Sequence, residues 1–162
     1  LNSNATVSFT SSSSHYMKTL PFNTQTGELT VVSVFKTGST VTGRVYYHTG
    51  EPGGSIAFKP TSDGVGGWNY SQTANKSRGS VTSTGTIAAS SANLGSYSYK
   101  VNGTAVAMLN GTNKVTSTDT GNPINQTGNA SKTIGAHPSP TDYWNGEIAE
   151  IIVFDKQLSR PS

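Results

Sequence analysis

The chain has 162 residues, with 11 Lys and Arg, eight Asp and Glu, and a formal net charge of +3. This length suits one domain with a sizeable core, and the low net charge with recurrent β-branched and aromatic runs argues against a disordered chain. Long tracts of Ser, Thr, Asn and Gly give poor helix propensity. We therefore expect a single all-β domain over residues 1–162.

Charge and composition exclude several classes of partner and site. The basic residues are scattered and form no run or basic helix, so we expect no nucleic-acid partner. The absence of cysteine excludes a disulfide scaffold and a thiolate metal site. No apolar stretch reaches the ~20 residues of a membrane span, so we expect no membrane insertion. The start at Leu1 and the style of composition suggest a piece of a larger protein or assembly, located extracellularly, on a cell surface or on a virion.

Period-two patterns and apolar runs bounded by Gly, Asn, Ser and Pro predict a series of short strands. In chain order they cover residues 6–9, 29–36, 44–49, 55–59, 67–71, 85–89, 96–101, 104–109, 132–134 and 147–154. Between two of them, Asn102-Gly103 is typical of a tight hairpin turn, because both residues tolerate positive φ.

The patterns within the strands differ, and they predict the position of each strand in its sheet. Residues 29–36 and 148–154 have apolar side chains of both parities, so we expect them to be central strands covered on two faces. In the strand at 44–49, Arg44, Tyr46 and His48 share one parity. Their polar character predicts a wetter face on which a ligand could lie.

Three tracts interrupt the strand pattern, at residues 11–14, 75–83 and 110–131. The last contains Pro123 and is long for a loop in a compact domain, so it is functional, mobile, or conceals short strands. Many short strands joined by surface loops, with no helical period, favour an antiparallel β-sandwich or jelly roll.

Three segments together resemble a known family. The segment "IGAHPSPTDYWNGEIAEIIVFDKQLS" at 134–159 resembles the closing strands of laminin-G-like domains, which are concanavalin A-like jelly rolls. "YKVNGTAV" at 99–106 is similar to the family's hairpin, and "HYMKTLPFNTQTGELTVVSVFKT" at 15–37 to its opening strand and long central strand. The resemblance implies a noncatalytic module that binds glycans or proteins, often with calcium. Fold alone does not decide among these functions.

Two carboxylates in the last predicted strand raise the question of catalysis. Glu147 and Glu150 are separated by an odd number of residues, so on a regular strand they point to opposite faces and cannot flank one bond. Jelly-roll glucanases that resemble this fold carry an E-x-D-x-x-E pattern, which is absent here. Glu150 shares the parity of Ile148, Ile152 and Phe154, so we interpret it as structural, at the rim of the core. We predict no catalytic residue and no enzyme.

Metal ligands are sparse. The three histidines, His15, His48 and His137, match no zinc spacing, and we interpret them as packing or solvated side chains. Asp63, Asp119 and Asp142 lie in Gly- and Thr-rich loops where carbonyl and carboxylate oxygens could hold calcium. Asp in such loops also caps turns. No cofactor is therefore certain, and calcium is the only one that we consider.

Aromatic side chains are the best indicators of a binding site, because sugar C–H faces stack on Trp and Tyr rings. Packing in the core is the alternative for every such group. Tyr143 and Trp144 follow the polar loop "HPSPTD", so we expect both to be exposed. The candidate ligand-binding residues are Arg44, Tyr46, His48, Trp68, Tyr70, Tyr143 and Trp144.

The sequence thus predicts a noncatalytic recognition or adhesion module on a bacterial or phage surface, with a glycan as the first-choice ligand. The alternative is a virion or surface-layer structural domain, such as a decoration or fibre domain, that contacts neighbouring protein subunits. In either case the domain could be homo-oligomeric or repeated within an assembly. A polysaccharide-degrading enzyme is the third hypothesis.

Overall fold

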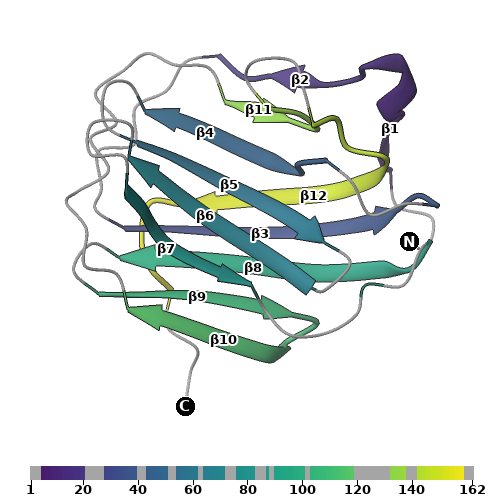
Figure 1. Ribbon diagram of the computed structural model, residues 1–162. Coiled ribbons are helices and arrows are strands. Elements are labelled where there is room, and N and C mark those ends of the chain that lie inside the picture. Colours follow the sequence, from purple (N-terminus) through teal and green to yellow (C-terminus); the bar gives the residue numbers. More distant parts are fainter. Residues whose placement is uncertain are drawn as a thin grey trace.

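The computed structural model describes residues 5–20, 28–39, 43–50, 54–61, 64–71, 76–82, 87, 90–100, 103–118, 132–137 and 142–158. For 47–50, 54–61, 64–71, 76–82, 99 and 112–118 it describes the backbone alone. Two antiparallel sheets stack as a β-sandwich (Figure 1). No helix in the described ranges is long and apolar enough to cross a membrane.

Within the described residues, each sheet has six strands. Sheet A runs in the order β1 (Val7–Phe9), β12 (Gly146–Phe154), β3 (Glu28–Thr37), β8 (Ala92–Lys100), β9 (Thr104–Leu109) and β10 (Thr112–Thr118). Sheet B runs in the order β2 (Met17–Lys18), β11 (Thr133–Ile134), β4 (Tyr46–Gly50), β5 (Gly54–Thr61), β6 (Gly64–Ser71) and β7 (Lys76–Thr82). The predicted all-β antiparallel sandwich is confirmed.

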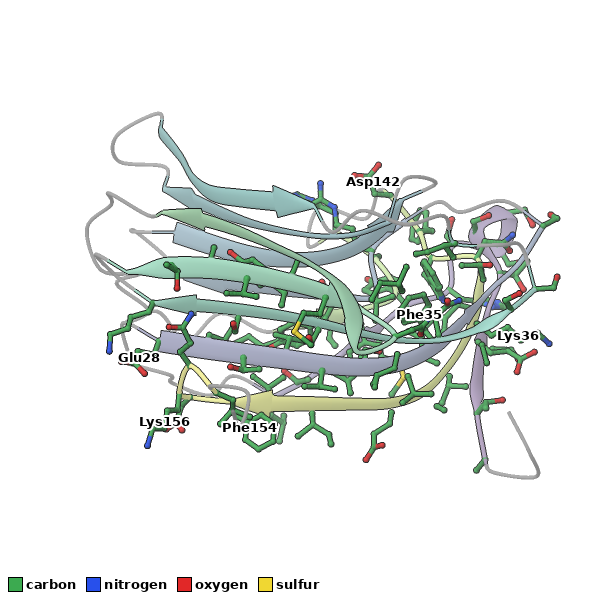
Figure 2. All side chains as sticks on the ribbon, turned by 90° about the horizontal axis from the view of Figure 1, so that it is seen from below. Glu28, Phe35, Lys36, Asp142, Phe154 and Lys156 are labelled. Atoms are coloured by element: carbon green, nitrogen blue, oxygen red, sulfur yellow. The ribbon has the colours of Figure 1, made fainter. Side chains whose placement is uncertain are left out.

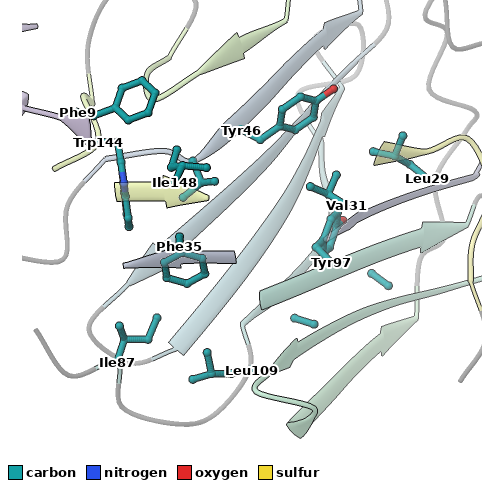
Figure 3. Packing of buried hydrophobic residues seen from close by; sticks show 13 residues of the cluster. Phe9, Leu29, Val31, Phe35, Tyr46, Ile87, Tyr97, Leu109, Trp144 and Ile148 are labelled. Atoms are coloured by element: carbon teal, nitrogen blue, oxygen red, sulfur yellow. The ribbon is translucent and has the colours of Figure 1, made fainter. Parts of the chain in front are cut away.

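The apolar side chains that alternate along β3 meet those of the opposite sheet between the two layers. Leu29, Val31 and Phe35 are buried there, while Val32 and Val34 face the other side of sheet A and are only half-buried. Figure 3 shows the core around them. Its buried members are Phe9, Leu29, Val31, Phe35, Val45, Tyr46, Ile87, Tyr97, Ala105, Ala107, Leu109, Trp144 and Ile148.

Most predicted strands are confirmed, and β3 and β12 do lie inside sheet A rather than at its edges. The strand expected at 85–89 falls largely outside the described residues. Two tracts interpreted as linkers, 75–83 and 110–131, contain the strands β7 and β10. The pattern did not reveal these strands because they are built from polar residues without apolar alternation. The short tract at 11–14 contains the 3₁₀ turn η1 (Ser11–Ser13). Strand β2 was not predicted from the residue pattern, but it lies in the segment whose resemblance implied an opening strand.

A β-bulge in β12 overturns the argument about the two carboxylates. Glu147 pairs with Lys36 and Ile148 with Phe35, but the next partner, Val34, pairs with Glu150. Ala149 is the extra residue, and an extra residue reverses the alternation of faces beyond it. Glu147 and Glu150 therefore share the outer face of sheet A, and the prediction of opposite faces was wrong.

The bulge also changes which residues of β12 reach the core. Beyond Ala149, Ile151 and Val153 pack against the core cluster, whereas Ile152 and Phe154 are exposed. Glu150 is exposed beside them instead of reaching into the rim of the core. The prediction that β12 is covered on both faces was therefore also wrong. Figure 2 shows Phe154 pointing away from the sandwich.

Candidate functional site

Arg44 and Asp142 form an ion pair where the β11–β12 loop meets the start of β4. The Nε and Nη2 atoms of Arg44 donate to Asp142 Oδ2 at 3.2 and 3.0 Å. The Arg44 backbone N–H also donates to the Asp142 carbonyl oxygen at 3.1 Å. Asp142 has a φ of 50°, a conformation that Asp tolerates better than most residues. The opposite charges of Arg44 and Asp142 thus neutralise each other and are held in a fixed geometry at the surface.

The loop behind this ion pair is held tightly against the sheet. Gly43 has a φ of +88°, and a Cβ atom there would overlap the Tyr143 carbonyl oxygen, so only glycine fits. The Trp144 N–H donates to the Gly135 carbonyl oxygen at 2.7 Å, and the Gly135 N–H donates to the Val45 carbonyl oxygen at 3.1 Å. These contacts fix where the side chains of residues 142–144 point.

Trp144 is fully buried, which contradicts the prediction that it is exposed. Its ring packs edge-on against Phe35, with centroids 5.7 Å apart and an interplanar angle of 86° (Figure 3). Among the described residues, its Nε1 is a buried side-chain nitrogen without a hydrogen-bond partner. The polar loop before it misled the prediction, because the backbone bonds turn this indole into the core. Trp144 cannot serve as a surface platform.

Tyr46 is buried as well, so the predicted wet face of Arg44, Tyr46 and His48 does not form as expected. Strand β4 begins only at Tyr46, so the alternation of faces does not extend back to Arg44. Burial raises the pKa of the Tyr46 phenol well above its ordinary range. The side chain of His48 lies outside the description.

Two tyrosine rings lie close together near the surface, and one of them, Tyr143, directly follows Asp142 in sequence. The rings of Tyr16 and Tyr143 are 6.3 Å apart and tilted by 50°. Tyr16 is exposed and Tyr143 half-buried. Lys18 Nζ lies 5.8 Å from the centre of the Tyr16 ring. Sequence reasoning found Tyr143 but did not single out Tyr16, although the resemblance implied an opening strand in the segment that begins "HYMK".

We call the set of Tyr16, Lys18, Arg44, Asp142 and Tyr143 the tyrosine site. Its rings offer apolar surfaces and phenol groups, and the ion pair offers hydrogen-bond donors and acceptors. It lies at the edge of sheet B, because β2 is the edge strand. Such an arrangement can bind a flat, hydroxyl-rich molecule by stacking and hydrogen bonding.

The edge strand at this site is fastened to the sheet by Lys132 and Thr19. The Thr19 N–H donates to the Lys132 carbonyl oxygen at 2.9 Å, and the Lys132 N–H donates to Thr19 Oγ1 at 3.1 Å. Lys132 is fully buried, and the loss of hydration lowers the pKa of its ammonium group. These bonds support the strand segment that carries Tyr16.

Trp68 and Tyr70 are not brought to the tyrosine site. Both belong to β6, whereas the tyrosine site lies at β2, and three strands separate β2 from β6 in sheet B. The structure describes only the backbone at these two residues, so their role in binding stays a prediction.

The calcium candidates do not assemble into a described site. Asp63 and Asp119 lie outside the described residues, and the Asp142 carboxylate is held by Arg44. Within the described ranges, no three His, Cys, Asp or Glu side chains are grouped as a metal site would require. Calcium binding stays a prediction.

The fold and its register define the chain as a jelly-roll β-sandwich protein. It belongs to the concanavalin A-like lectin/glucanases superfamily, whose laminin G model matches residues 10–162. This confirms the resemblance seen in the sequence. No curated protein sequence matches the chain.

Solved structures agree on the fold. The chain is similar to domains LG4–5 of the mouse laminin α1 chain, with a TM-score of 0.73 and 17% identity, covering 99% of this chain and 46% of that one. It is similar to domain 4 of AbnA, an extracellular GH43 arabinanase from Geobacillus stearothermophilus solved with arabinotriose (TM-score 0.67, 17% identity, coverage 89% and 68%). It is also similar to a heptameric SAP-like pentraxin from Limulus polyphemus (TM-score 0.67, 19% identity, coverage 96% and 78%). The chain thus spans about half the length of the laminin fragment.

Proposed function

We propose that the chain is a noncatalytic recognition module that binds a glycan at the tyrosine site. The observation that carries the proposal is the tilted pair of Tyr16 and Tyr143 at the edge of sheet B, next to the Arg44–Asp142 ion pair. A pyranose or furanose ring has apolar C–H faces that stack on such rings and hydroxyl groups that bond to the charged side chains. Because the platform is already formed, binding requires little ordering of side chains.

The family supports this proposal without fixing the ligand. One similar domain was solved in complex with arabinotriose, so this fold can be associated with an oligosaccharide. Laminin G-like domains are typically extracellular, and we propose the same location for this chain, on a cell surface or a virion. Weak binding at each site would be strengthened by repetition of the module.

We propose no catalytic role for the two carboxylates, Glu147 and Glu150. The bulge brings Glu147 and Glu150 to one face, yet the Glu147 carboxylate is held by Lys36 at 3.2 Å and by the Thr6 hydroxyl at 3.4 Å. It therefore has partners within the fold that account for its presence. If the chain were an enzyme, it would release new reducing or unsaturated ends from a polysaccharide. Such activity in the wild-type chain, and its loss in Glu150→Gln, would contradict the proposal of a noncatalytic module.

A glycan array followed by calorimetry on the strongest ligand tests the binding proposal. We expect Tyr143→Ala and Tyr16→Ala each to weaken binding at least about fivefold, since an aromatic contact contributes about 1 kcal/mol. Tyr143→Phe is the matched control, because it keeps the ring and should retain most of the affinity. Absence of any glycan ligand, or binding that survives loss of both rings, would refute the proposal.

A structural role is the second candidate. The specific observation that favours it is the apolar outer face of sheet A, which lies on a different sheet from the tyrosine site. A domain that contacts neighbouring copies could use that face and still bind a glycan at the edge of sheet B.

A further inference from the structure

The β9–β10 hairpin turns on an asparagine–glycine dipeptide at one edge of sheet A. Leu109 pairs with Thr112, so the turn consists of Asn110 and Gly111 alone. Their φ angles are 53° and 71°, which is the geometry of a type I′ turn. Figure 1 shows this hairpin as the last pair of strands in sheet A. In such a dipeptide, the side-chain amide of the asparagine and the backbone nitrogen of the glycine can react with each other.

Hydrogen bonds from its backbone and its side chain hold Asn110 against β8. Its N–H donates to the Leu94 carbonyl oxygen at 2.7 Å, and its Oδ1 accepts from the Leu94 N–H at 2.8 Å. Its Nδ2 donates to Oδ1 of Asn93 at 3.2 Å, and Nδ2 of Asn93 donates to the Ser91 carbonyl oxygen at 2.8 Å. Because a backbone N–H only donates and a carbonyl oxygen only accepts, the Leu94 N–H and the Ser91 carbonyl fix the orientation of both side-chain amides.

The backbone nitrogen of Gly111 is much less restrained than the amide beside it. A Cβ atom built at Gly111 would meet no described atom within 4 Å. Among the described residues, none accepts a hydrogen bond from the Gly111 N–H. Asn110 is exposed, so water reaches both reacting groups. The reaction between them therefore requires only that the Asn110 amide leaves its partners on β8.

We infer that Asn110 is a site of spontaneous deamidation in the folded protein, and that the opening of its hydrogen bonds to β8 controls the rate. The Gly111 nitrogen gives its proton to a solvent base and attacks Cγ of Asn110. A bond forms between this nitrogen and Cγ, the bond from Cγ to Nδ2 breaks, and the amide nitrogen leaves as ammonia with a proton from water. Water then opens the resulting cyclic imide at either of its carbonyl carbons, which leaves aspartate or isoaspartate. Water is the only co-reactant, and nothing is oxidised or reduced.

The same dipeptide occurs at Asn145–Gly146, where the fold opposes the reaction. Gly146 begins β12 and pairs with Phe9 of β1 on one side and with Thr37 of β3 on the other. A Cβ atom built at Gly146 would overlap the Lys36 carbonyl oxygen. Ring closure has to turn the glycine nitrogen toward the side chain, and here that movement breaks pairing on both sides of the strand. The structure therefore distinguishes two identical dipeptides by the freedom of the glycine backbone.

Deamidation loosens the β9–β10 hairpin from β8. In the aspartate product, an oxygen replaces Nδ2 of Asn110 and faces Oδ1 of Asn93, so two acceptors meet without a proton between them. Asn93 is only 7% exposed, so little water can separate these oxygens. In the isoaspartate product, the main chain runs through Cγ and gains one carbon, which the tight turn between β9 and β10 does not accommodate. Refolding reverses neither product, so the reaction sets a chemical lifetime for this edge of sheet A.

Peptide mapping by mass spectrometry, on samples kept in mildly alkaline buffer with and without urea, tests the inference. In the folded chain, we expect aspartate and isoaspartate to form at Asn110 at least about tenfold faster than at Asn145, because a hairpin tip opens more readily than a strand paired on both sides. In urea, the two sites should react at similar rates, both faster than Asn110 in the folded chain. Fragmentation spectra separate Asn110 from Asn102, which precedes Gly103 and lies outside the described residues.

The variant Asn93→Ala tests the role of the bonds to β8. It removes the acceptor of Asn110 Nδ2 and should speed the reaction at Asn110 in the folded chain about fivefold, which is the change that loss of one hydrogen bond produces in an opening equilibrium. In urea the same variant should react at the wild-type rate, because no bond holds the amide there. Circular dichroism will check that it remains folded.

Gly111→Ala is the chemical control, because its Cβ atom screens the attacking nitrogen and should slow the reaction at Asn110 in urea. Equal rates at Asn110 and Asn145 in the folded wild-type chain would overturn the inference, and this comparison needs no variant. So would an Asn110 that reacts only after unfolding, or a folded-state rate that Asn93→Ala leaves unchanged. None of these measurements involves a glycan, so failure here is distinguishable from failure of the tyrosine site.

Discussion

Replacement of Trp144 by Ala and by Phe tests whether this residue is a core side chain with an unpaired donor. Trp144→Ala removes a fully buried indole and should lower the free energy of unfolding by about 3–5 kcal/mol. Trp144→Phe keeps a ring that can still contact Phe35 edge-on. It also removes Nε1, which has no partner, and relief of an unsatisfied donor is worth about 1–3 kcal/mol. That gain offsets part of the void left by the smaller ring.

We therefore expect the Phe variant to lose less than about 2 kcal/mol, well below the loss in the Ala variant. Urea denaturation gives both values, and for a chain of this size the Ala variant should melt roughly 6–20 °C lower. A loss under about 1 kcal/mol for Trp144→Ala would show that the ring is not in the core. Equal losses in the two variants would show that Nε1 donates to a bound water or another group.

Other substitutions test the loop, the bulge and one ion pair. Gly43→Ala should cost more than about 1–2 kcal/mol in a thermal melt, because left-handed strain adds to overlap with a backbone carbonyl; a melting point equal to wild type would refute this. Deletion of Ala149 should leave a folded sheet, because Ile148 and Glu150 already pair with consecutive residues of β3. Deletion of Ile151 should unfold the chain, because it reverses the faces of the residues that follow. An equal loss of stability in the two deletion variants would count against the bulge. The hydrogen bond from Lys100 holds the pKa of Glu28 below its ordinary value, so this group favours folding above its unfolded pKa and loses that effect as the pH falls through the folded pKa. In Lys100→Met, NMR titration should show the Glu28 pKa moved upward, and an unmoved pKa would contradict the assigned cause.

The strands that could be predicted from the sequence are those whose buried positions carry apolar side chains. The run "LTVVSVFK" is rich in β-branched and aromatic residues, and β3 was predicted within one residue of each of its ends. Strands β7 and β10 were missed because "KSRGSVT" and "TNKVTST" contain mainly polar side chains. Their strand geometry comes from backbone bonds to a neighbour, which leave no trace in composition.

The candidate site shows a similar division. Tyr143, Arg44 and Asp142 were all singled out from the sequence, and the structure places Arg44 against Asp142. The partner ring of Tyr16 is more than 100 residues away along the chain, and no local pattern brings it there. Burial of Trp144 depends on a backbone bond from the segment before β12 to Gly135, just after β11, and no local pattern shows this bond.

The position of β12 has a consequence for biosynthesis. This strand lies between β1 and β3, and the contact between Thr6 and Glu147 spans 141 positions along the chain. Until a ribosome has released β12, a nascent chain has no neighbour for β1 and leaves one side of β3 open. Contacts over such separations are slow to form because the intervening loop must close first. Chaperone demand during translation should therefore fall once β12 has emerged.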